Sequence, residues 1–194
     1  MVPPMLDIDE VIIERARLGD LEAFRLIVEA FERPIYCTVF RMVGSRFAAD
    51  VEDICQEVFL KIFRSLPSFD AQRGTKLSTW IFTFVKNHCF DVLKRRRLSV
   101  VSIDQSPEGF GHSTALVEEV LPPEELEARE LRREIETAVN KLPDEQRMTF
   151  VLREYEGLSY TEIAEVLGCS QGTVKSRLSR AKDTLRTLMR KYVS

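Results

Sequence analysis

Histidine and cysteine are scarce in this chain of 194 residues, which contains two His and four Cys. The cysteines stand at Cys37, Cys55, Cys89 and Cys169, with no C-x-x-C pair and no histidine at ligand spacing. Zinc sites show closely paired ligands, and disulfide frameworks show dense cysteines. We therefore expect no metal, no cofactor and no disulfide framework.

Long apolar runs and strand-like alternation are also missing. The N-terminal residues lack the cationic start and apolar run of a signal peptide, and no apolar stretch is long enough to span a bilayer. We expect a cytoplasmic protein without a membrane segment of its own. Since no segment sustains strand alternation, we expect an all-α fold. A chain of this length with 44% apolar residues can bury one ordinary core or two small ones, and we expect two small helical domains.

Basic residues are absent from the middle of the chain. Residues 98–128 hold seven acids and no Lys or Arg, although the net charge of the whole chain is only −3. Pro, Gly and Ser recur through this stretch, which indicates an acidic flexible linker at 98–124 between helical domains at 1–97 and 125–194. Its composition fits both a plain spacer and a binding segment.

Apolar residues recur at helical spacing before the linker. One helix begins after Asp20 and ends at Gly44, and Pro34 is expected to kink or restart it. A second helix closes at Pro67, and a third runs from about residue 78 to residue 97. The N-terminal half is therefore predicted to be a compact helical domain.

A helix-turn-helix is predicted after the linker. Ser159 and Glu162 form a capping box, Gly168 suits a left-handed helix stop, and Ser170 caps the next helix. The inward stripe of that second helix is predicted to be Val174, Leu178, Ala181, Leu185 and Leu188. Two short helices joined by a turn of about three residues are typical of DNA-binding domains.

The outward face of this second helix combines short hydroxyls with long cations. Residues 170–194 hold seven basic residues against the single acid Asp183. The face and its flanks carry Thr173, Lys175, Ser176, Arg177, Ser179 and Arg180. Such side chains suit base edges and phosphates, so the coincidence of caps, glycine and charge favours DNA binding over a merely solvated basic face.

The helix predicted at 78–97 has two different faces. Ile81, Val85, Cys89 and Val92 form an apolar one, and the other carries Trp80, Phe84, Asn87, Asp91 and Lys94. A cation cluster follows at Lys94, Arg95, Arg96 and Arg97. Aromatics, an amide and cations are the components of single-strand binding sites. Taken alone, however, the pattern favours Trp80 and Phe84 as core residues.

The helix before it carries an acidic face. Asp50, Asp53 and Glu57 lie opposite the apolar stripe of Val51, Ile54, Val58 and Ile62. Like charges on one face repel unless a cation or basic partner lies opposite them. The spacing also allows a metal site, but no His or further acid converges nearby in the sequence, and charge alone favours a solvated face.

The three stretches, in this order, resemble a bacterial RNA polymerase sigma factor of the extracytoplasmic-function (ECF) type, which has only the second and fourth conserved regions. "DVEDICQEVFLKIFRSLPSFD" is similar to the helix that docks on the clamp helices of the largest polymerase subunit. "KLSTWIFTFVKNHCFDVLKRRR" is similar to the part that opens and reads the minus-ten element. "LPDEQRMTFVLREYEGLSYTEIAEVLGCSQGTVKSRLSRAKDTLR" is similar to the region that reads the minus-thirty-five element and touches the flap of the second-largest subunit.

The resemblance covers nearly the whole chain and implies an alternative sigma factor, a specificity factor rather than an enzyme. It implies polymerase binding by Asp50, Asp53, Gln56 and Glu57. It assigns the minus-ten element, melted to single strands, to Trp80, Phe84, Asn87, Lys94, Arg95 and Arg96, and the upstream duplex element to Thr173, Lys175, Ser176, Arg177, Ser179 and Arg180. It also implies control by an anti-sigma factor and a linker that threads toward the RNA exit path.

Two other functions remain open at this point. A stand-alone regulator would bind an operator as a dimer, using an apolar face at Leu185, Leu188, Met189 and Tyr192. An enzyme would need a site around His88, Cys89 and Asp91, but these residues are crowded into one helical turn without a nucleophile and base pair.

Overall fold

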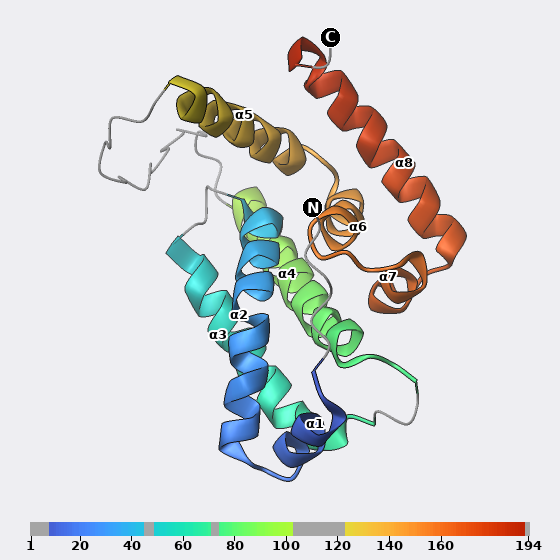
Figure 1. Cartoon of the computed structure of the whole chain (residues 1–194). Coiled ribbons are helices and arrows are strands. Elements are labelled where there is room, and N and C mark those ends of the chain that lie inside the picture. The colour runs from blue at the N-terminus through green and yellow to red at the C-terminus, as the bar shows by residue number, and fades with distance from the viewer. Residues whose placement is uncertain (1–7, 45–48, 71–73, 103–122, 193–194) are drawn as a thin grey trace.

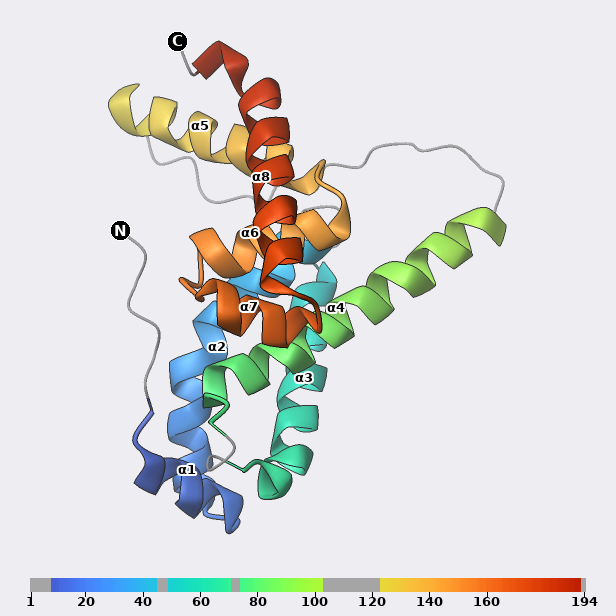
Figure 2. The same ribbon diagram turned by 90° about the vertical axis from the view of Figure 1, so that its right-hand side faces the viewer.

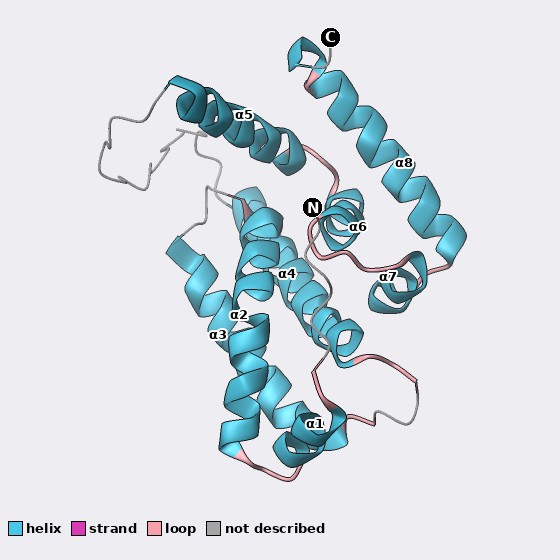
Figure 3. Ribbon diagram, viewed as in Figure 1, coloured by secondary structure: helices cyan, strands magenta, loops and turns pink. Residues whose placement is uncertain are grey.

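The computed structural model describes residues 8–44, 49–70, 74–102 and 123–192, and all regular structure in these ranges is helical (Figures 1 and 3). The prediction of an all-α fold is therefore confirmed. The elements are α1 Glu10–Arg17, α2 Leu21–Val43, α3 Val51–Ser65, the 3-10 turn η2 Leu66–Ser68, α4 Leu77–Ser102, α5 Pro123–Asn140, α6 Asp144–Glu154, α7 Tyr160–Leu167, α8 Gln171–Leu188 and the 3-10 turn η4 Arg190–Tyr192.

Helix α2 begins and ends where the sequence predicts. The Asp20 carboxylate accepts hydrogen bonds from the backbone N–H groups of Glu22 and Ala23, and Gly44 ends the helix with φ +80°. The expected restart at Pro34 is wrong, because α2 is continuous across it. The buried side chains of Phe31 and Ile35 anchor the turns on both sides of Pro34 in one core, which offsets the missing backbone hydrogen bond.

The N-terminal region packs α3 and α4 against α2, with α1 across one end of α2 (Figure 1). The predicted α3 stripe is confirmed, because Val51, Ile54, Val58 and Ile62 are all at most 5% exposed. Helix α4 continues past the predicted end to Ser102, and α5 begins at Pro123. Both helices thus extend into the stretch predicted as a linker, and residues 103–122 lie outside the described residues.

The C-terminal region consists of α5 to α8, with α8 packed on α6 and α7. Val174, Leu178 and Ala181 are buried as predicted, whereas Leu185 is half-buried. The inward placement of Leu188 is wrong, since its side chain is 38% exposed. Met189, the next residue in the chain and the C-cap of α8, is buried instead.

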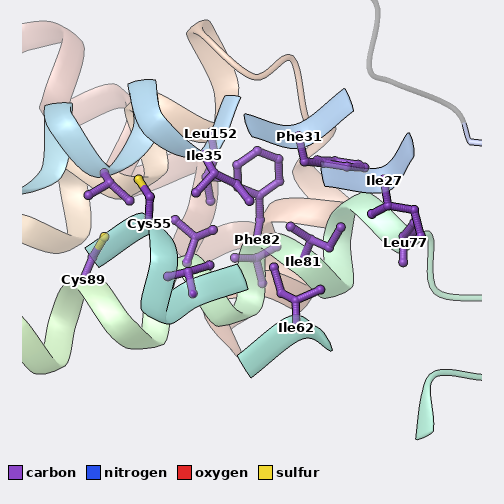
Figure 4. Packing of buried hydrophobic residues seen from close by; sticks show 14 of the residues in the cluster. Ile27, Phe31, Ile35, Cys55, Ile62, Leu77, Ile81, Phe82, Cys89 and Leu152 are labelled. Carbon is purple, nitrogen blue, oxygen red and sulfur yellow. The ribbon is translucent and has the colours of Figure 1, made fainter. Parts of the chain in front are cut away.

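The two regions share one apolar core. Helix α7 packs on α4 and helix α6 packs on α2, and Figure 2 shows α7 lying across α4. Leu152 of α6 lies beside Ile35 of α2 within the buried cluster (Figure 4). Leu158 and Ile163 belong to the same cluster and are 0% exposed. The buried apolar side chains of the two regions therefore form one continuous cluster.

Polar contacts border this shared core. The Thr38 hydroxyl donates a hydrogen bond of 2.9 Å to the Glu156 carboxylate. The guanidinium of Arg41 lies 3.8 Å from the ring centroid of Tyr155, and Lys76 pairs with Glu162 at 3.0 Å. Burial raises the pKa of Glu156 to about 7, against the lowering effects of Thr38 and Arg41.

All four cysteine thiols are free. Burial raises the pKa values of Cys55 and Cys89 to about 12, so both thiols stay protonated and poorly reactive near neutral pH. In the described ranges, no group of His, Cys, Asp and Glu side chains could hold a metal ion. Among the same residues, no helix is both long and apolar enough to cross a membrane.

Candidate nucleic-acid interface

The helix-turn-helix of α7 and α8 is built by local capping. Ser159 Oγ accepts from the backbone N–H of Glu162, and the Glu162 carboxylate accepts from the backbone N–H of Ser159. Gly168 adopts φ +64°, the left-handed conformation that residues with a Cβ rarely adopt, and Ser170 Oγ accepts from the N–H of Thr173. The predicted capping box, stop and second cap are all confirmed.

The outward face of α8 presents Lys175, Ser179 and Arg180, whose side chains are exposed. They lie opposite the buried Val174, Leu178 and Ala181, as the helical spacing predicts. A hydroxyl between two long cations on a protruding helix can contact base edges and phosphates in a major groove. This cluster is therefore the part of the predicted upstream-element set that is available to DNA.

The other three residues of that set also take part in contacts within the domain. The Arg177 side chain is only 18% exposed and pairs with Glu145 of α6. Ser176 Oγ donates to the carbonyl oxygen of Thr173 at 2.9 Å, and both residues are half-buried. Their side chains are therefore engaged in contacts within the domain more than those of Lys175, Ser179 and Arg180.

The aromatic residues of α4 form a partly buried cluster. The Trp80 and Phe84 rings meet edge to face at 4.7 Å between centroids, and Phe69 lies 5.1 Å from Trp80. Trp80 and Phe84 are half-buried and pack on the core. Part of each ring is thus used by packing, and the remainder is accessible to solvent.

The polar end of the same helix face is open to solvent. Asn87, Lys94 and Arg95 are exposed. Two further arginines of the basic run form ion pairs, Arg96 with Asp50 at 2.6 Å and Arg97 with Asp144 of the C-terminal region. Asp50 and Asp144 therefore neutralise two cations, Arg96 and Arg97, of the predicted basic cluster.

The acidic face of α3 is exposed along its length. Asp50, Asp53, Gln56 and Glu57 are all exposed, as predicted. Leu60 continues this face and is 52% exposed, and Phe63 is 41% exposed. Exposed apolar side chains beside a row of carboxylates form a surface that a partner with apolar and basic groups could cover.

Sequence reasoning missed the role of His88. Its ring is 2% exposed, with Nδ1 2.6 Å from the Lys61 ammonium and Nε2 3.2 Å from the Glu57 carboxylate. Burial, followed by the charge of Lys61, lowers the pKa of His88. Lys61 and His88 are 27 positions apart, so no local pattern could have shown the contact.

Sequence models of two protein families match the chain. The model of sigma-70 region 2 matches residues 27–98, and the model of sigma-70 region 4 matches residues 132–185. The first match includes α4 as far as residue 98, with its aromatic and basic residues, and the second includes α7 and α8 as far as residue 185. The two matches thus indicate a transcription factor of the sigma-70 class with regions 2 and 4.

Several curated proteins are similar over nearly the whole chain. The ECF RNA polymerase sigma-E factor of Escherichia coli strain K12 is 36% identical over 181 residues, which cover 91% of this chain and 92% of that protein. The Haemophilus influenzae sigma-E factor is 31% identical over 180 residues, with 91% and 93% covered. The chain belongs to the ECF RNA polymerase sigma factors.

Solved structures share the fold. CnrH in complex with the cytosolic domain of CnrY matches with a TM-score of 0.69 at 23% identity, covering 94% of this chain and 97% of CnrH. The Bartonella quintana sigma factor RpoE, in complex with the anti-sigma factor NepR, matches with a TM-score of 0.68 at 24% identity, covering 86% and 96%. Family membership supports an alternative sigma factor and does not support the stand-alone operator-binding regulator.

Proposed function

We propose that this sigma factor binds core RNA polymerase through the acidic face of α3 and directs it to promoters with two separated elements. The observation that carries the proposal is the exposure of Asp53, Gln56 and Glu57 beside Leu60 on a helix whose opposite side is buried. The clamp helices of the largest subunit would receive this face. The chain supplies specificity, and the polymerase supplies the catalysis.

The upstream element would be read by the recognition helix α8. Lys175, Ser179 and Arg180 are exposed together and supply donors for base edges and phosphates. Thr173, Ser176 and Arg177 would contribute nearer the helix axis and fix its position. The same domain would contact the flap of the second-largest subunit.

The minus-ten element would be opened and read along α4. Asn87 is exposed and carries an amide that can pair with a base edge, next to the partly exposed edges of Trp80 and Phe84. Lys94, Arg95 and Arg96 would hold the phosphates. Unpairing a base costs a few kcal/mol, so this step needs the duplex to be held by polymerase.

We further propose three functional segments: a polymerase-docking and minus-ten domain at 1–97, an acidic linker at 98–124 directed toward the RNA exit path, and an upstream-element domain at 125–194. The factor would act in the cytoplasm under an anti-sigma factor, as the fold-related RpoE occurs with NepR. No cofactor is required by this scheme.

Run-off transcription from fragmented genomic DNA tests the proposal. Bacterial core polymerase is assayed with and without the protein, and the transcript starts are sequenced. We expect new starts that share two short elements at a fixed spacing. Core polymerase that stays silent, together with protection of palindromic duplex by the protein alone, would contradict the proposal.

A further inference from the structure

His88 connects the helix proposed to read DNA with the helix proposed to dock on polymerase. It lies on α4, one residue after Asn87, and its ring is 2% exposed. Its two ring nitrogens face side chains of α3, Lys61 at 2.6 Å and Glu57 at 3.2 Å. A buried ring with both nitrogens directed at one neighbouring helix fixes the position of that helix's side chains.

The contacts define the tautomer of the ring. The Lys61 ammonium can only donate, so Nδ1 accepts and the ring proton is on Nε2, which lies 3.2 Å from the Glu57 carboxylate. The charged groups around the ring are Lys61 and Glu57 on α3 and Asp91 and Arg95 on α4. Burial and the nearby Lys61 lower the pKa of His88, which is consistent with this neutral form at physiological pH.

The Glu57 carboxylate contacts the His88 ring at the edge of the exposed surface. Its side chain is 60% exposed, whereas Lys61 is half-buried. A free glutamate loses rotamer freedom when a partner binds it, and an attractive contact with the N–H of a fixed ring removes part of that loss beforehand. An apolar residue at position 88 would fill the same space with less desolvation but could not orient the carboxylate.

We infer that His88 is a positioning residue of the polymerase-docking face, holding the Glu57 carboxylate in the orientation that core polymerase binds. The inference rests on the proposed function, because it requires Glu57 to contact polymerase. This role accounts for the burial and the contacts of His88, which neither the helix-turn-helix nor the minus-ten face explains. His88 also connects α3, the proposed docking helix, with the part of α4 that carries Asn87.

The first test compares His88→Gln with His88→Met in the full chain, measuring affinity for bacterial core polymerase by competition. Glutamine keeps an N–H donor near the position of Nε2, whereas methionine keeps volume without a donor. We expect His88→Met to weaken binding about 5-fold and His88→Gln to stay within about 2-fold, as for one polar contact with a charged, partly solvated group. Equal affinities for His88→Met and the unaltered chain would overturn the inference.

A second variant leaves the core untouched. Glu57→Asp keeps the charge but shortens the side chain. The shorter carboxylate cannot contact His88 Nε2 and also reach the position that Glu57 presents to polymerase. We expect a loss similar to that of His88→Met, and no further loss when the two changes are combined. Glu52→Asp, an exposed residue of the same helix, is the matched control and is expected to bind normally. Full affinity of Glu57→Asp would contradict the inference even if His88→Met failed to fold.

Glu57→Gln distinguishes the docking role of Glu57 from the positioning role of His88. If Glu57→Gln binds polymerase normally, the docking role of Glu57 is wrong, and the inference falls with it. If Glu57→Gln weakens binding while His88→Met and Glu57→Asp do not, the docking role stands and only the positioning role of His88 is wrong.

Discussion

Arg147 Nη1 donates a hydrogen bond of 2.9 Å to the main-chain carbonyl oxygen of Met42, across 105 positions of the chain. Met42 lies in the last turn of α2, where carbonyl groups have no partner within the helix. The guanidinium is 8% exposed and pairs with Asp144 at 2.8 Å. A cation from the C-terminal region thus caps the negative end of a helix in the N-terminal region.

Arg147→Met should destabilise the whole fold. The change leaves the Met42 carbonyl and the Asp144 carboxylate without this donor, and we expect a loss of about 2–4 kcal/mol in the free energy of unfolding. Urea denaturation followed by circular dichroism measures it. Arg132→Met, at an exposed position of α5, is the control and should cost less than about 0.5 kcal/mol. Equal losses in the two variants would show that the cap contributes nothing.

The stability of the fold should fall as pH rises through neutrality, because of Glu156. Burial raises its pKa from the ordinary 4.5 to about 7, so between these values the folded state holds a proton that the unfolded state has lost. The stabilising contribution is fully present below about pH 4.5 and disappears as pH rises through about 7.

Glu156→Gln removes this dependence. At pH 8 the variant should be more stable than the unaltered chain by about 1–3 kcal/mol, and the difference should shrink toward pH 5. Glu165→Gln, at an exposed position of α7, should leave the pH profile unchanged. Parallel urea-denaturation profiles for the unaltered chain and Glu156→Gln would be evidence against a titrating Glu156.

Charge reversal on α3 should weaken polymerase binding while the fold stays intact. Asp53→Lys with Glu57→Lys replaces two exposed carboxylates on the proposed docking face, and we expect affinity for core polymerase to fall at least about 10-fold. Glu10→Lys with Glu32→Lys makes the same change in net charge at exposed sites elsewhere. Unchanged co-elution of the α3 variant with core polymerase would count against the docking face.

Arg180→Ala should impair promoter use without affecting polymerase binding. Arg180 is exposed on the outward face of α8, and loss of a base contact there should cost about 1–3 kcal/mol in promoter affinity of the holoenzyme. Arg186→Ala, later on the same helix, is the control, since Arg186 already pairs with Asp183 at 3.0 Å. Loss of polymerase binding together with promoter use would indicate misfolding instead of a lost DNA contact.

Features set by neighbouring residues were predictable from the sequence, and contacts between distant residues were not. Ser159, Glu162 and Gly168 act within one or two helical turns, so their spacing alone predicts the capping box and the stop. The contacts of Arg147 and His88 join residues far apart in the chain. Periodicity likewise predicts that Trp80 and Phe84 share a face, but not that Phe69 covers that face in part.

Because the two regions share one continuous core, separating them costs free energy. Drawing the regions apart would bring apolar side chains of the shared cluster into contact with water, at about 1.5–3 kcal/mol for each side chain that becomes fully exposed. A partner that stretches the chain across two distant surfaces must therefore either cover these side chains or bind tightly enough to offset their hydration. Affinity for any such partner contains the cost of opening the molecule.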